Sequence, residues 1–348
     1  MIIGVGLDGR LSLKLPEMRE AARQAASMGF ESAWTPAGGV PDSFHLCDQW
    51  SLATEEVLGH PLRTGISVVP APRSWNPLSL AAQAATLGVV SGNRFVLGIG
   101  TGGAGASYWN NAGLPDRPIA VMRDYLQVLR RLLAGETVSY DGPALHVDQY
   151  ALGGERVDVP VFLAALGPQM LRLAGEAADG ACLNWASPEQ IAWSRERLGE
   201  GAAKAGRDAS SLVLSMYIRV CVDENVEAAR RAFATQVLGY ALVRQGGDTT
   251  LAYRGHFGRM GFDEALRELE ARRDAGESIE QLCDSVPEEL LTEVGYYGSA
   301  SGAAARFAAL SSGLDETIVR VVTATKTLDA TLYAMDALTP DKIRAAAA

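Results

Sequence analysis

The chain has 348 residues and a formal net charge of −10, and its lysines and arginines are scattered, which argues against a basic face for nucleic acid or anionic lipid. The first methionine leads directly into a strand-like run, with no signal sequence and no apolar run of about 18 residues, so we expect a cytoplasmic protein without a membrane partner. The 4 cysteines lie far apart with no Cys-x-x-Cys pair, which argues against a metal site and a disulfide framework and leaves a small molecule as the expected partner.

Strand-like and helical patterns alternate along the first half of the chain. Short apolar runs predict strands over residues 2–8, 30–35 and 62–69 and from 94 onward. Apolar residues at helical spacing predict helices from Pro16 to Gly29 and over 43–58, 78–88 and 119–133. The segment TVSYDGPALHV at 137–147 holds two alternating runs around Asp141-Gly142, which predicts a β-hairpin outside this alternation.

The same alternation resumes in the second half. Strands are predicted over 159–166, 181–185, 212–222 and 316–322, and helices from 168 and over 188–205, 224–244, 302–311 and 328–338. Residues 245–297 carry no apolar strand pattern and are rich in charge and glycine, so they predict a mostly helical insertion in the seventh unit. We expect this insertion to be a mobile lid or specificity element whose deletion abolishes activity and spares the folding of the rest.

Eight predicted strands, each followed by a helix, indicate a parallel sheet, because parallel neighbours need helical crossovers. The simplest fold is an α/β protein with one (β/α)8 TIM barrel spanning residues 1–348, a β-hairpin excursion and the insertion at about 245–297. A doubly wound sheet is the alternative, and it needs a domain boundary that the composition does not show.

A glycine-rich loop follows the fourth predicted strand. The stretch RFVLGIGTGGAGASY, residues 94–108, passes from a buried strand into a loop almost without side chains, which suits a phosphate or a flat ring. A tight turn that needs glycines for its own geometry is the alternative. In a barrel this loop lies on the active face, as do the helix starts at Gly167-Pro168 and Gly298-Ser299, where free N–H groups suit a phosphate.

Four segments resemble one protein family over nearly the whole chain. They are LRTGISVVPAPRSWNP (62–77), GNRFVLGIGTG (92–102), LGPQMLRLAGEAADGACLNWASP (166–188) and YGSASGAAARFAALSSGLDETIV (297–319). These segments resemble the luciferase-like monooxygenase superfamily, and within it the coenzyme F420-dependent branch typified by methylenetetrahydromethanopterin reductase. The resemblance implies a barrel with an insertion and members that commonly pair as homodimers.

The resemblance also implies a cofactor site. Its ring would lean on a bulge after the third strand, formed by a non-proline cis peptide that we expect at Gly65-Ile66, with Ile66 under the ring. The implied cofactor-binding residues are Gly65, Ile66, Ser67, Gly100, Thr101, Gly102, Gly103, Ala165, Gly167, Pro168, Gly298 and Ser299. The implied cofactor is F420, with FMN as the alternative, and the implied activity is hydride transfer between the deazaflavin C5 and a small organic substrate. An FMNH2-dependent monooxygenase and a barrel that binds a flavin-like molecule without turnover remain alternatives.

The sequence departs from the family where the usual proton donors stand. Pro36-Ala37-Gly38 replaces the Thr-Asp-His or Glu at the end of the second strand, and Gly6 replaces an acidic residue in the first. The methanopterin substrate is therefore not carried over with the fold. We expect Asp8, Asp42 or His45 to move protons instead. Aromatic residues near strand ends suggest a substrate pocket walled by aromatic rings, with a place in the core as the alternative for each: Trp34, Trp75, Tyr108, Trp109 and Trp185.

Overall fold

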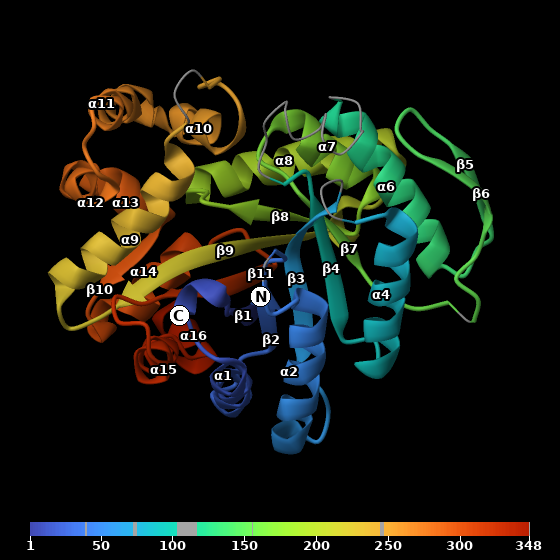
Figure 1. Ribbon diagram of the computed structural model, residues 1–348, viewed down its shortest axis with the longest axis horizontal. Helices are drawn as coiled ribbons and strands as arrows, with labels where there is room; N and C mark the ends of the chain where they lie inside the picture. The colour runs from blue at the N-terminus through green and yellow to red at the C-terminus, as the bar shows by residue number, and fades with distance from the viewer. Residues whose placement is uncertain (39, 72–74, 103–116, 155, 244–246, 348) are drawn as a thin grey trace.

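The computed structural model describes residues 1–38, 40–71, 75–102, 117–154, 156–243 and 247–347 (Figure 1). Eight parallel strands form a closed ring: β1 (Ile2–Gly6), β2 (Ser32–Thr35), β3 (Arg63–Pro70), β4 (Phe95–Gly100), β7 (Val161–Ala164), β8 (Gly180–Asn184), β9 (Val213–Val222) and β11 (Glu316–Val322). The ring closes because β8 pairs with β9, β9 with β11, and β11 with β1. The predicted TIM barrel is thereby confirmed.

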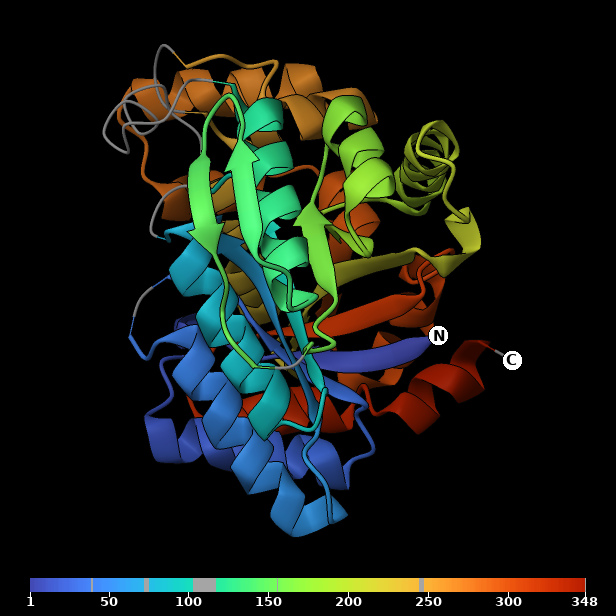
Figure 2. The same cartoon turned by 90° about the vertical axis from the view of Figure 1, so that its right-hand side faces the viewer.

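Helices cover the outside of the barrel (Figures 1 and 2). They are α1 (Leu15–Ser27), α2 (Ser43–Leu58), α4 (Pro77–Val90), α6 (Pro118–Leu133), α7 (Pro168–Ala177), α8 (Pro188–Lys204), α9 (Val226–Ala241), α14 (Ala300–Leu310), α15 (Leu328–Asp336) and α16 (Pro340–Ala347). Short 3-10 helices lie at Gly9–Leu11 (η1) and Ala209–Ser211 (η2). Side-chain caps start several of these helices, as Asn76 does for α4 and Ser187 for α8.

The predicted hairpin consists of β5 (Val138–Asp141) and β6 (His146–Tyr150), paired antiparallel and lying against α6 (Figure 2). Asp124 of α6 is 1% exposed and holds the hairpin in place. Its carboxylate accepts hydrogen bonds from the Tyr140 hydroxyl at 2.7 Å and from the Ala144 amide at 2.7 Å.

The insertion contains α10 (Ala252–Phe257), a π-helical segment η3 (Gly258–Phe262), α11 (Asp263–Asp274), α12 (Ile279–Leu282), a 3-10 turn η4 (Cys283–Ser285) and α13 (Glu288–Val294). It also contains a strand, β10 (Gly295–Gly298), which pairs parallel with β9. The sequence-based expectation of no strand here was wrong, because β10 is four residues long and begins and ends with glycine, so it has no apolar run to detect.

A separate hydrophobic cluster joins this insertion to α9. It includes Phe233 and Val237 of α9 with Leu266, Leu282 and Leu290 of the insertion, all fully buried. Removing 245–297 would uncover this cluster and take away β10. We therefore expect the deletion to destabilise the barrel, contrary to the expectation from the sequence.

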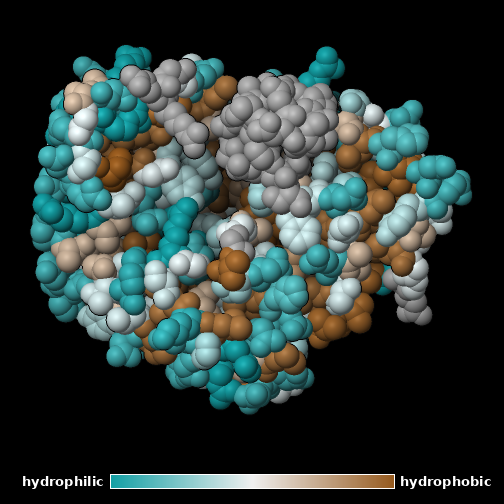
Figure 3. All heavy atoms as spheres, in the orientation of Figure 1, coloured by the Kyte–Doolittle hydropathy of each residue, from teal (hydrophilic) through white to brown (hydrophobic). Residues whose placement is uncertain are grey.

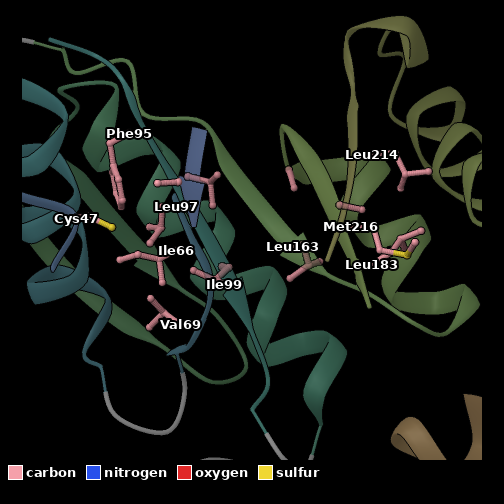
Figure 4. Packing of buried hydrophobic residues seen from close by; sticks show 14 of the residues in the cluster. Cys47, Ile66, Val69, Phe95, Leu97, Ile99, Leu163, Leu183, Leu214 and Met216 are labelled. Atoms are coloured by element: carbon pink, nitrogen blue, oxygen red, sulfur yellow. The ribbon is translucent and has the colours of Figure 1, made fainter. Parts of the chain in front are cut away.

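Two further cores lie on either side of the barrel wall. Figure 4 shows Ile66 and Leu97 together with Cys47 of α2 in the outer core, between the strands and the helices. The lumen is filled by a smaller cluster that contains Trp34, Phe162, Val96, Cys182, Tyr217 and Ile318. At the amino-terminal end of the strands, fully buried Glu316 accepts hydrogen bonds from Trp34 Nε1 at 2.9 Å and from Arg63 at 2.8 Å. This packing fills the lower lumen and leaves the carboxyl-terminal mouth as the place for a ligand.

Candidate active site

An ion pair of Asp8 with Arg320 lies at the barrel mouth, where β1 and β11 end. Both residues are buried, with exposed fractions of 5% and 4%. A Cβ at Gly6 would lie 2.9 Å from Arg320 Cδ, so glycine at this position leaves room for the arginine. The guanidinium carbon of Arg320 lies 4.7 Å from the centre of the Tyr217 ring. Arg320 Nη1 and the Tyr217 hydroxyl are both buried without a hydrogen-bond partner among the described residues.

A second buried arginine, Arg219 of β9, lies beside this pair and is 3% exposed. Its Nη1 donates to Asn184 Oδ1 at 2.5 Å, and its Nη2 donates to the Tyr240 hydroxyl at 3.3 Å. Its guanidinium carbon lies 3.9 Å from the centre of the Trp185 ring. Within the described residues it has no carboxylate partner, and burial lowers its pKa.

The hydroxyl of Tyr240, on α9, accepts hydrogen bonds from two guanidinium groups. Arg10 Nη2 donates to it at 3.1 Å and Arg219 Nη2 at 3.3 Å. Burial raises the pKa of Tyr240, but the two positive charges outweigh burial, so the net pKa lies below the ordinary value of 10.0. Because the oxygen is the acceptor in both hydrogen bonds, neither of them uses the hydroxyl's own proton.

The insertion supports this mouth from outside the barrel. Tyr253 of α10 accepts a hydrogen bond from Asn184 Nδ2 at 2.7 Å. His256 of α10 lies 2.8 Å through Nε2 from the Trp185 carbonyl oxygen. Burial lowers the pKa of His256 to about 4, so the ring is neutral and donates this bond. The insertion thus positions the residues that surround Arg219.

The predicted cis peptide lies two residues further along β3 than expected. The bond between Ser67 and Val68 is cis, and the pairing of β3 with β4 shifts register between Ile66 and Val69. The prediction of Gly65-Ile66 was therefore wrong. Ile66 is fully buried in the outer core (Figure 4). Val68 packs on the lumen cluster instead. The residue pattern of β3 does not show at which peptide bond the bulge occurs, because the position of the bulge depends on how β3 pairs with β4.

Small residues line the lumen side of this bulge. A Cβ at Gly100 would lie 2.9 Å from Val68 Cγ2 and 2.9 Å from Ala164 Cβ. At Gly65 it would lie 2.4 Å from the Trp34 ring, so that glycine makes room for an aromatic side chain. The structure therefore places Gly100 beside the bulge, at the end of β4.

The structure describes the glycine-rich loop as far as Gly102. Thr101 and Gly102 are half-buried after β4, and Gly102 has φ 75°, in the left-handed region that favours glycine. Gly103, Tyr108 and Trp109 lie outside the described residues.

Two predicted helix starts offer free backbone N–H groups. Gly167 precedes α7, with Pro168 at its first position, and Ser299 precedes α14; neither start has a side-chain cap hydrogen bond. Gly298 has φ 142°, and Ala165, which is 2% exposed, uses its amide to bond the Cys182 carbonyl at 3.2 Å.

The other two predicted proton-transfer residues lie at the start of α2. Asp42 caps this helix by accepting from the amides of Phe44 and His45, and its Oδ1 lies 2.9 Å from His45 Nδ1. The His45 side chain is 85% exposed. The structure brings Asp42 and His45 together, but among the described residues no hydrogen bond or ion pair links them to Asp8.

Sequence reasoning missed Arg219, Arg320, Tyr217 and Tyr240. A signal for the arginines was present, because each interrupts an otherwise apolar strand, SMYIRVCV or ETIVRVV. A charge in the middle of a buried strand indicates a paired or ligand-binding group. Within the described ranges, no cluster of three or more His, Cys, Asp or Glu could hold a metal ion, and none of the helices there is long and apolar enough to cross a bilayer.

Comparison with known proteins places this barrel among related chains. The family described as luciferase-like monooxygenase matches residues 4–317. The 5,10-methylenetetrahydromethanopterin reductase of Archaeoglobus fulgidus is 29% identical over 231 residues, covering 65% of this chain and 67% of that protein. The F420-dependent glucose-6-phosphate dehydrogenase of Mycobacterium leprae is 30% identical over 233 residues, covering 61% and 67%. The structure of coenzyme F420-dependent tetrahydromethanopterin reductase from Methanopyrus kandleri superimposes with a TM-score of 0.77 at 20% identity, covering 98% of this chain and 99% of that one.

Proposed function

The chain belongs to the luciferase-like monooxygenase family, and from this premise we propose that it is an oxidoreductase that binds coenzyme F420. The relatives at 29% and 30% identity, a methylenetetrahydromethanopterin reductase and an F420-dependent dehydrogenase, support this cofactor. When bound, F420 supplies a ring carbon, C5, that takes up or gives up a hydride. The second reactant is a small organic molecule.

The residues around the β3 bulge fit such a group. The observation that carries the proposal is the bulge itself, where the pairing of β3 with β4 shifts between Ile66 and Val69 and Val68 packs against Gly100, a position with no room for a Cβ. Val68, half-buried against the lumen cluster, offers an apolar surface to a flat ring.

A phosphate fits the helix starts named above. The backbone N–H groups in the first turns of α7 and α14, which follow Gly167 and Ser299, are not capped by side chains, so they can bind an anion; Pro168 itself has no N–H to donate. Arg259 of the insertion donates to the Leu166 carbonyl at 3.1 Å, which brings a positive charge next to Gly167. We propose that these residues hold the cofactor's phosphate.

Proton transfer to or from the substrate falls to Tyr240 in this proposal. The Tyr240 residue is half-buried, and its hydroxyl has the lowered pKa described above. Asp8 is engaged with Arg320, and Asp42 caps α2, so both are less free to exchange protons. His45 with Asp42 remains the alternative that the sequence suggests.

The choice between F420 and FMN is tested by titrating the protein with each cofactor and following tryptophan fluorescence. We expect F420 to bind in the micromolar range or tighter, a free energy of about −8 kcal/mol. Binding of FMN alone would favour an FMN-dependent monooxygenase and overturn the proposal. We also propose that the protein is a homodimer, because members of the family commonly pair as homodimers. Light scattering of the purified protein tests this.

A further inference from the structure

A narrow hollow at the barrel mouth, with about 10 Å³ of free space, has more cationic than anionic side chains in its lining. We call it the cationic pocket; its charged lining residues are Arg10, Arg219, Arg320, Lys326 and Asp8, and Gln236 also lines it. Four cationic side chains therefore face a single carboxylate, in a chain whose formal net charge is −10. Figure 3 shows the surface hollowed beside the insertion, with hydrophilic side chains along its edge. A local excess of positive charge in an acidic protein points to an anionic ligand.

The one carboxylate in the pocket lining, that of Asp8, already has a cationic partner. Asp8 pairs with Arg320, which leaves Arg320 Nη1 buried and unpartnered among the described residues. Arg219, 3% exposed, has only the neutral Asn184 and Tyr240 as hydrogen-bond acceptors within the described part of the chain. A buried guanidinium without a counter-charge is costly, and an anion in the pocket would remove that cost.

The pocket also lies where a substrate would lie. In the ring of eight strands, β9, which carries Arg219, stands four places from β3, which carries the bulge. Likewise β11, which carries Arg320, stands four places from β4, which carries Gly100. A molecule anchored by the two arginines therefore extends from the opposite wall toward the proposed ring position. The Tyr240 hydroxyl, bonded to Arg219, lies at the same wall.

We propose that the cationic pocket binds the carboxylate or phosphate group of the substrate, so that the enzyme acts on small organic anions. This inference rests on the proposed function, because it assigns the second reactant of that reaction. F420 itself carries a phosphate and a glutamate tail, so the same anionic chemistry has two possible sources. The experiment must separate substrate from cofactor.

Isothermal titration calorimetry with benzoate, phenyl phosphate and neutral benzamide provides the test, on protein with and without F420. We expect benzoate or phenyl phosphate to bind about tenfold or more tightly than benzamide, in both states of the protein. Arg219→Gln and Arg10→Gln should each weaken binding of the anion about tenfold. Arg231→Gln, on the exposed face of α9 and paired with Glu227 and Asp284, is the matched control and should change nothing.

The outcomes separate the two proposals. Equal affinity for anions and benzamide, or anion binding that is insensitive to both variants, overturns the inference. If F420 abolishes anion binding and the variants weaken F420 instead, the pocket holds the cofactor's own acidic groups; the inference is then wrong while the proposed function stands. If F420 fails to bind but the anions behave as expected, the proposed function fails and the anion pocket is supported. Arg10 is exposed, so Arg10→Gln carries the test if Arg219→Gln does not fold.

Discussion

Arg219 lies directly over the ring of Trp185, with 3.9 Å between the guanidinium carbon and the ring centre. Trp185 has φ 58°, an uncommon value for a residue other than glycine, and its carbonyl oxygen is bonded by His256 of the insertion at 2.8 Å. A chain of contacts thus runs from the insertion through Trp185 to the buried cation at the mouth. The insertion therefore helps to position Arg219 in the candidate active site, through His256 and Trp185.

Replacing Trp185 tests this support. Trp185→Leu removes the ring beneath Arg219, and a desolvated cation–π contact contributes about 2 kcal/mol. We expect a lower melting temperature and weaker benzoate binding. Trp193→Leu, on α8 beside Arg197 at 5.9 Å, serves as the control and should affect benzoate binding little. Equal effects of the two variants on benzoate binding would contradict a specific role for Trp185.

His256 should make stability depend on pH. Burial lowers its pKa from 6.5 to about 4 in the folded protein, so the unfolded chain binds a proton that the folded one does not as pH falls through this window. This contribution to stability is complete above pH 6.5 and decreases by about 2 kcal/mol on going from pH 7.5 to pH 5. Urea unfolding at both pH values measures it. His256→Gln, which keeps a donor for the Trp185 carbonyl, should lose that part of the pH dependence.

Tyr240 should control the alkaline limb of activity. If its neutral hydroxyl donates the proton, kcat falls as pH rises through its pKa, which lies below the ordinary value of 10.0 because of the two guanidinium groups. Tyr240→Phe should lower kcat about 100-fold and remove this limb from the pH profile. Tyr333→Phe, an exposed tyrosine of α15, is the control. A profile unchanged in Tyr240→Phe would assign the proton transfer elsewhere.

A larger residue at Gly98 would test the role of the β3 bulge, because it would clash with the backbone there. A Cβ at this position would lie 2.5 Å from the Ile66 carbonyl oxygen, so Gly98→Ala must displace backbone. We expect a loss of about 1–3 kcal/mol in the free energy of unfolding together with weaker F420 binding. Gly199→Ala, within α8 and with no heavy atom within 4 Å of its added Cβ, should stabilise the protein slightly. Denaturant titration compares the two.

Two variants test the proposed contacts with F420. Gly102→Val introduces a branched side chain at φ 75°, and Ser299→Glu places a carboxylate at a helix start proposed to hold a phosphate. Each should weaken F420 binding about tenfold or more, as measured by fluorescence titration. Unchanged affinity in both variants would mean that the cofactor does not use these two segments.

The sequence alone determined the class of fold and its family, because alternating apolar runs and helical patterns arise from local periodicity and the glycine segments are contiguous. It also located Gly100 and the starts of α7 and α14, whose geometry depends on neighbouring residues in the chain. Only the tertiary structure decided that the cis peptide joins Ser67 to Val68, because that interruption depends on how β3 pairs with β4. It alone brought Arg219 and Arg320 together with Tyr240, since these residues come from separate elements: the two arginines are register partners in the pairing of β9 with β11, and Tyr240 reaches Arg219 from α9.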